Sequence, residues 1–194
     1  MPSHKIHLSI AQEVNKELKL DNDSIMLGSV LPDLTIERNH GLSHFQFEDI
    51  YPKNLANADE FIKKYPDMKD DISIGYIIHL LTDKYYNDTF YHTNIVGIEH
   101  NKNFKHNLFD SYDMYLLRHK KVNKFEKIDI INEIPLYKDI SFDIEYLKAY
   151  INNTNNQIDS ITYDKNFKID YQIFLNDLYA GCIKYILNNI NKYR

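Results

Sequence analysis

The most informative segment of the chain is Asp71-Ile-Ser-Ile-Gly-Tyr-Ile-Ile-His79-Leu-Leu-Thr-Asp83-Lys-Tyr-Tyr-Asn87. Most of its residues up to Leu81 are apolar, which is typical of a helix in a protein core. His79 and Asp83 lie four residues apart, so an imidazole and a carboxylate share one face of the predicted helix. Gly75, one turn before His79, lies on the same face and leaves space there.

Polar groups in the middle of an apolar helix must be solvated, paired or bound to an ion. A salt-bridged pair of His79 and Asp83 on a half-exposed helix is the simplest interpretation of this motif in isolation. A metal ion bridging the two side chains is the alternative. The motif is not isolated in this chain, and the other histidines and carboxylates favour the metal.

The apolar periodicity of the rest of the chain predicts further helices and almost no strands. We expect helices over residues 3–20, 23–30, 54–65, 70–91, 102–117 and 169–191. Ser3 is the predicted N-cap of the first. A polar loop is expected at 35–43, only short helical patterns at 119–167, and a mobile connection at 152–157. The chain is therefore predicted to be one all-α domain, a compact multi-helix bundle whose motifs lie in residues 4–115 and whose C-terminal helical part spans 120–194.

The bulk composition limits the function classes. A chain of 194 residues with 43% hydrophobic content can bury a full core, and its net charge of -5 argues against a stable nucleic-acid complex. The single cysteine, Cys182, excludes an intramolecular disulfide and falls on an apolar stripe of the last helix. The N-terminus shows neither a signal-peptide nor a membrane-anchor pattern, so a cytoplasmic protein is expected. The composition leaves the oligomeric state open.

Further potential ligands occur on or next to separate predicted helices. They are His7, expected to point inward from the first helix, Asp33, His44, His92 and a second pair with the same spacing, His106 and Asp110. For this second pair, a solvated polar face is the competing interpretation. Zinc prefers imidazole and carboxylate ligands where thiolates are absent. Two or three clustered cations would acidify a bridging water and neutralise a phosphate, which is the chemistry of phosphoester hydrolysis.

The order of the motifs resembles a known family. The chain carries His7-Leu-Ser-Ile-Ala, Gly28-Ser-Val-Leu-Pro-Asp33, Ser43-His44-Phe45, Gly75-Tyr-Ile-Ile-His79-Leu-Leu-Thr-Asp83 and His106-x3-Asp110. These motifs, in this order, are similar to those of the zinc-dependent phospholipase C family, which is related to single-strand-specific zinc nucleases. The resemblance covers residues 4 to about 115.

The resemblance implies a role for each motif residue. Asp83 would bridge two zinc ions, with His79, Asp33 and His44 completing the shell of one of them and His7 serving the ion on the other side. A third ion would be held by His92, His106 and Asp110. Asp33 would also be a candidate general base, positioned to orient or deprotonate the attacking water.

The chain departs from the family pattern at three points. Secreted relatives bind zinc through an N-terminal tryptophan, and this chain contains no tryptophan; His4, three residues before His7, is a candidate substitute. Asp110 stands where glutamate is usual. No β-sandwich follows the helical part, which makes membrane phospholipid a doubtful substrate.

Three functions are compatible with these observations. The first is an intracellular zinc-dependent hydrolase of small phosphoesters, most readily phosphodiesters, that uses metal-activated water. The second is a metal-stabilised binding or regulatory module of the same fold whose incomplete site no longer activates water. The third, an HD-type phosphohydrolase, requires an adjacent His-Asp dipeptide, and none occurs in the sequence. The sequence favours the first.

Overall fold

The computed structural model of the chain describes residues 2–36, 40–46, 56–91, 102–160 and 171–194. Helices make up most of this part, and its only sheet-like contact is an isolated antiparallel bridge between Thr35 and Phe142. The predicted all-α class is confirmed. The elements are α1 (His4–Leu18), α2 (Asn22–Gly28), η1 (Leu31–Asp33), α3 (His40–Ser43), α4 (Ala58–Lys64), α5 (Asp71–Tyr85), η2 (Tyr86–Tyr91), α7 (Lys102–Arg118), η3 (Asp129–Glu133), α8 (Ile144–Asp159), α9 (Tyr171–Ile173), η4 (Phe174–Ala180), α10 (Gly181–Asn189) and η5 (Ile190–Tyr193).

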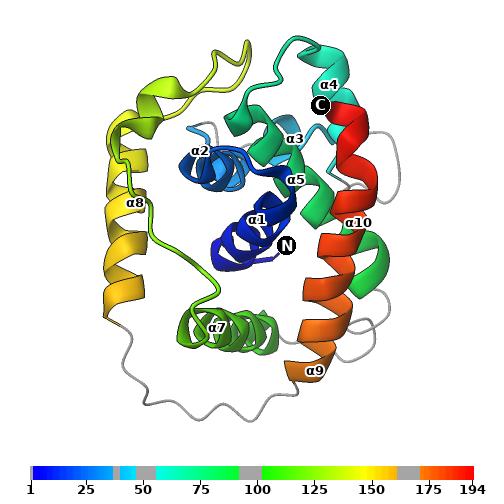
Figure 1. Ribbon diagram of the computed structural model, residues 1–194, viewed down its shortest axis with the longest axis vertical. Coiled ribbons are helices and arrows are strands. Elements are labelled where there is room, and N and C mark those ends of the chain that lie inside the picture. Colours follow the sequence, from blue (N-terminus) through cyan, green and yellow to red (C-terminus); the bar gives the residue numbers. More distant parts are fainter. Residues whose placement is uncertain (1, 37–39, 47–55, 92–101, 161–170) are drawn as a thin grey trace.

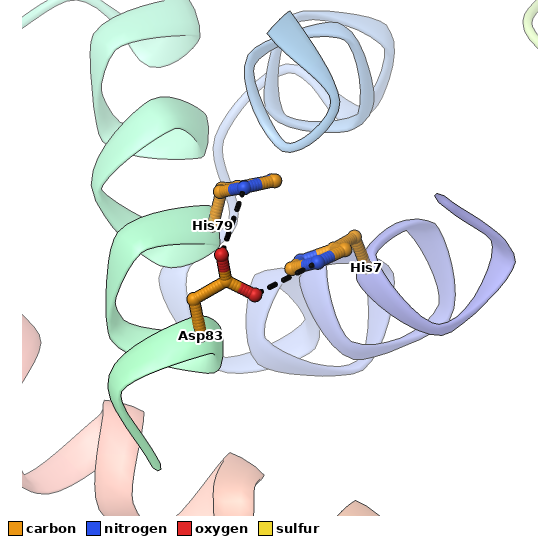
Figure 2. A group of neighbouring side chains, drawn as sticks. All are labelled: His7, His79 and Asp83. Atoms are coloured by element: carbon orange, nitrogen blue, oxygen red, sulfur yellow. Dashed lines mark ion pairs between the residues drawn. The ribbon is translucent and has the colours of Figure 1, made fainter. Parts of the chain in front are cut away.

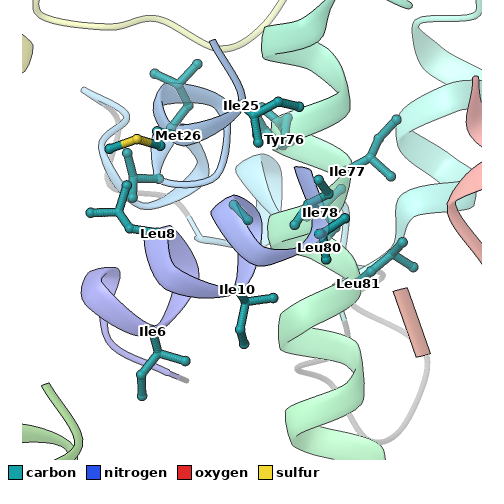
Figure 3. Close-up of a cluster of buried hydrophobic side chains, with 14 of the residues drawn as sticks. Ile6, Leu8, Ile10, Ile25, Met26, Tyr76, Ile77, Ile78, Leu80 and Leu81 are labelled. Atoms are coloured by element: carbon teal, nitrogen blue, oxygen red, sulfur yellow. The ribbon is translucent and has the colours of Figure 1, made fainter. Parts of the chain in front are cut away.

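Three helices, α1, α2 and α5, form the centre of the bundle, and α7, α8 and α10 surround them (Figure 1). Their facing side chains make up the core, in which Ile6, Ile10 and Ile78 are fully buried (Figure 3). The side chain of Ser3 accepts a hydrogen bond from the backbone N–H of Ile6, so the predicted N-cap of α1 is confirmed. Among the described residues, no helix combines the length and the apolar character needed to span a membrane.

Two glycines allow α2 and α5 to touch through their backbones. A Cβ atom on Gly28 would lie 2.0 Å from the carbonyl oxygen of Ile72, and one on Gly75 would lie 2.4 Å from that of Ile25. No side chain fits at such distances, because real Cβ atoms do not approach backbone oxygens this closely. The space that Gly75 leaves is therefore occupied by α2, which brings the C-terminal part of that helix against the N-terminal part of α5.

Two of the predicted long helices contain π-helical segments. The predicted helix 70–91 is α5 followed by η2, and the last helix begins with α9 and η4 before α10. The hydroxyl of Tyr85 donates a hydrogen bond to the carbonyl of Asp177 inside η4, over a space that Gly181 leaves open. The predicted apolar stripe of this helix, which includes Cys182, is confirmed as buried.

The polar run 152–157 is not a connection, and that prediction was wrong. It lies inside α8, which Asp143 caps at its N-terminus. Leu147, Ile151 and Thr154 are buried on one face of the helix, so the exposed asparagines around them lie on its solvent side. The expected loop 35–43 likewise ends in the short helix α3.

Candidate metal centre

Five of the eight predicted ligands converge at the centre of the bundle. His7 comes from α1, Asp33 from η1, His44 from the residue after α3, and His79 and Asp83 from α5. The three histidines have an exposed fraction of 0% and Asp83 of 1%, and the side chain of Asp33 is 8% exposed. These titratable groups are therefore removed from bulk water. A salt-bridged pair of His79 and Asp83 on a half-exposed helix, the alternative interpretation of the sequence, would be in contact with water.

Asp83 lies between two imidazoles and presents one oxygen to each. Its Oδ1 atom is 3.4 Å from Nε2 of His7, and its Oδ2 atom is 3.6 Å from Nε2 of His79 (Figure 2). The rings of His7 and His79 stack with their centroids 3.9 Å apart. The carboxylate of Asp83 is thus oriented like a bridge between two sides of the centre.

His44 and Asp33 complete one of these sides. Nε2 of His44 lies 3.3 Å from Oδ2 of Asp83, 3.4 Å from Oδ1 of Asp33 and 3.0 Å from Nε2 of His79. Ligand atoms of four side chains therefore surround one small volume. All of them are imidazole nitrogens or carboxylate oxygens, which zinc accepts as ligands.

The nitrogen–oxygen distances in the centre suit a metal ion better than hydrogen bonds. Charge-assisted hydrogen bonds between nitrogen and oxygen have lengths of about 2.7–2.9 Å. Two ligands of a tetrahedral zinc ion with bonds of 2.0–2.1 Å lie about 3.3–3.4 Å apart. Four nitrogen–oxygen pairs of the centre are separated by 3.3–3.6 Å.

Hydrogen bonds on the far side of the rings orient His79 and His44. Nδ1 of His79 lies 2.8 Å from the carbonyl oxygen of Ser29, to which it donates a hydrogen bond. The proton on Nδ1 leaves the lone pair of Nε2 directed into the centre. Nδ1 of His44 lies 3.0 Å from the hydroxyl of Ser43, whose carbonyl accepts a hydrogen bond from Tyr76. No local pattern in the sequence indicates the role of Ser29, since it depends on how the helices pack.

Several buried atoms of the centre have no hydrogen bond within the described part of the chain. They are both ring nitrogens of His7 and both carboxylate oxygens of Asp83. Buried polar groups without a partner are costly and are rare in folded proteins. A cation between them would remove this cost, so the residues present fit a metal ion.

Burial and mutual charge determine the protonation of the centre. Burial lowers the pKa of His7 to about 4, and the neighbouring His79 adds to this effect, so His7 is a neutral ligand at pH 7. Burial also opposes the charge of His44, but the carboxylates of Asp33 and Asp83 outweigh it and raise the pKa of His44 to about 9. Burial would raise the pKa of Asp83, but the surrounding histidines hold it well below its usual range.

Two overlapping groups could hold a metal ion. One consists of His7, His79 and Asp83 and the other of Asp33, His44 and His79, with the ligand atoms of each group within 4.8 Å of one another. His79 belongs to both, yet its single lone pair on Nε2 can bind only one ion. Asp83, in contrast, has an oxygen for each side.

The remaining predicted ligands are not part of these groups. His92 lies outside the described residues, the backbone of His106 belongs to α7, and Asp110 is exposed on the same helix. His4, the candidate substitute, has its Nε2 atom 3.4 Å from Oδ2 of Asp33, and its side chain is 35% exposed. The distance of 3.4 Å is the same as in the buried pairs of His7 with Asp83 and of His44 with Asp33. Because His4 is partly exposed, the side of the centre nearest to solvent lies at His4.

No protein-family model, no curated protein and no solved structure matches the chain.

Proposed function

We propose that the chain is a zinc-dependent hydrolase of small phosphoesters, most readily phosphodiesters. The observation that carries the proposal is the buried group of His7, Asp33, His44, His79 and Asp83, whose ligand atoms have the spacing of a coordination shell. The all-α fold and the order of the ligands in the chain are similar to those expected for the zinc-dependent phospholipase C family.

The ligands divide between two ions in this proposal. Asp33, His44, His79 and Asp83 would hold the first ion, while His7 and Asp83 would hold the second. Bound zinc would supply an acidified water and positive charge for the phosphoryl oxygens. His7 and Asp83 alone would not fill the shell of the second ion, which would leave room for water or a phosphoryl oxygen.

Asp33 would orient the attacking water rather than deprotonate it. Burial would raise the pKa of its carboxyl group, but His79, His4 and His44 lower that pKa far below its usual range. A carboxylate with such a low pKa is a weak base but a good hydrogen-bond acceptor. Its Oδ2 atom faces His4 at the solvent side of the centre, where a substrate would enter.

A second candidate function is a metal-stabilised binding module. It is favoured by the four ligands around the first ion, because a filled shell is typical of a structural site. In that case the ion stabilises the junction of η1, α3 and α5 and does no chemistry.

Hydrolysis of a chromogenic phosphodiester, bis(4-nitrophenyl) phosphate, distinguishes the hydrolase from the metal-stabilised binding module. The zinc-loaded protein is expected to release nitrophenolate, and Asp83→Ala to be at least about a hundredfold slower. Asp88→Ala is the matched control, because Asp88 is exposed on η2 and pairs with Lys84. Bound zinc without hydrolysis over a broad panel of phosphoesters would support the module instead.

A further inference from the structure

A pocket of about 300 Å³ lies between the C-terminal ends of α1 and α7, and none of the five converging ligands lines it. Every residue that lines it is polar or charged. We call it the basic pocket, because it contains Lys16, Lys120, Lys121 and His119 but only one carboxylate, Glu13. Counting only the lysines and Glu13, three positive charges and one negative charge give it a net charge of +2, in a chain whose net charge is -5.

Two of the three lysines of the basic pocket, Lys120 and Lys121, differ from Lys16 and from other nearby lysines in their ion pairs. Lys16 pairs with Glu13 at 2.7 Å, and Lys127, nearby in the sequence, pairs with Asp21 at 2.9 Å. Within the described ranges, Lys120 and Lys121 have no such carboxylate partner. Two exposed ammonium groups are thus available at the rim of one concavity.

Lys120 also has a backbone conformation that favours glycine. Its φ angle is 51°, and its N–H and that of Lys121 donate to the carbonyls of Leu117 and Leu116, which closes α7. Glycine adopts this left-handed conformation at the end of a helix without steric cost. A lysine in this conformation has a steric cost that glycine would avoid, but its side chain places a positive charge at the pocket.

The helix ends do not cancel this positive charge. The C-terminus of a helix carries partial negative charge on its last carbonyls. At the end of α7, the carbonyls of Leu116 and Leu117 accept the two backbone hydrogen bonds described above. At the end of α1, Asn15 accepts a hydrogen bond from Lys19 through its carbonyl, while its side chain bonds Leu20. At roughly −0.5 elementary charge each, the two helix ends offset about half of the +2 charge of the side chains, so the pocket keeps a net positive charge.

We propose that the basic pocket binds a small molecule through a phosphate group. Ammonium groups act as point charges toward phosphate, and the volume is at the low end for small-molecule sites. The side-chain amide of Asn123 and the ring of His119, which lies 4.2 Å from that of Tyr115, would supply polar contacts to the rest of the ligand. The site is independent of the metal centre.

The test is a titration of the isotope-labelled full chain with inorganic phosphate at low ionic strength, followed by the backbone amide signals of Lys121 and Asn123. We expect saturable shifts of these signals, while the signals of His7 and His79 report separately on any phosphate at the metal centre. A parallel titration with chloride at the same ionic strength is expected to shift these signals more weakly, because chloride carries a single charge. Equal affinity for chloride would overturn the assignment to phosphate.

Lys120→Gly and Lys19→Gly form a matched pair of variants. Both lysines are exposed, end a helix and have a left-handed backbone, with φ angles of 51° and 57°, but only Lys120 lines the pocket. Glycine keeps the fold at both positions because it relieves the backbone. We expect phosphate to bind about fivefold more weakly to Lys120→Gly and unchanged to Lys19→Gly. Equal weakening by both variants, or phosphate shifts confined to the metal centre, would overturn the proposal.

Discussion

The carbonyl oxygen of Ser29 lies 2.8 Å from Nδ1 of His79 and fixes the proton of that imidazole on the side away from Asp83. Through this contact, the packing of the helices determines how a side chain of the candidate metal centre is oriented. Ser29 follows α2 directly, and α2 reaches α5 only because Gly28 and Gly75 have no side chains. The orientation of a candidate metal ligand therefore depends on a backbone contact between two helices.

Gly28→Ala is expected to lower the free energy of unfolding by about 3 kcal/mol, because its Cβ would overlap the backbone carbonyl of Ile72. Gly181→Ala is the matched comparison, since its Cβ would meet the hydroxyl of Tyr85, which can rotate away. We expect a smaller loss there, of about 1 kcal/mol. Urea unfolding measures both values. Equal stability of Gly28→Ala and the parent chain would contradict the close packing of α2 and α5.

Removal of zinc is expected to destabilise the fold. A ligand that binds only the native state at 100 times its Kd adds about 2.7 kcal/mol to the free energy of unfolding. The thermal midpoint should therefore fall when a chelator is added and rise again with zinc. Asp83→Ala should show little of this response, because it lacks the oxygens that face both His7 and His79. A response in Asp83→Ala as large as in the parent chain would place the zinc elsewhere.

The affinity for zinc is expected to fall as the pH falls. In the metal-free centre, the carboxylates of Asp33 and Asp83 outweigh burial and raise the pKa of His44 to about 9, so an ion must displace its proton below that pH. This predicts a loss of about tenfold in affinity per pH unit between pH 8 and 5. The slope should steepen near the pKa of His7 at about 4. Competition with a chelator between pH 8 and 4 measures the affinity for zinc. An affinity that does not depend on pH would contradict the assignment of His44 as a zinc ligand.

Asp113 gives a separate pH dependence of stability. Burial raises the pKa of its carboxyl group to about 6, while Ser3 and Lys5 oppose this shift. The folded state therefore favours the protonated form, and this stabilisation is present below about pH 4 and is lost as the pH rises through 6. Its size is about 2 to 3 kcal/mol. Asp113→Asn should remove this part of the pH profile in urea unfolding, and an unchanged profile would contradict the shift.

The sequence predicted most of the long helices and the pair of His79 and Asp83 because both follow from local patterns. Asp33 and His44 were assigned to the same site from the order of the motifs along the chain. Apolar periodicity marks a buried face, and the spacing of His79 and Asp83 places them together on one turn of a helix. The polar run 152–157 was misread because its asparagines conceal the stripe of Leu147 and Ile151. The contact between Gly28 and Gly75, the carbonyl of Ser29 and the basic pocket depend on tertiary packing, which periodicity does not encode.

We propose that the buried histidines and carboxylates form a metal centre. The most direct test is the zinc content of the full chain by mass spectrometry after reconstitution and dialysis, measured beside Asp83→Ala and the control Asp88→Ala. We expect two zinc ions per chain in the parent and in Asp88→Ala, and one or none in Asp83→Ala. A parent chain that retains no zinc, or an Asp83→Ala variant that retains as much as its parent, would contradict the claim.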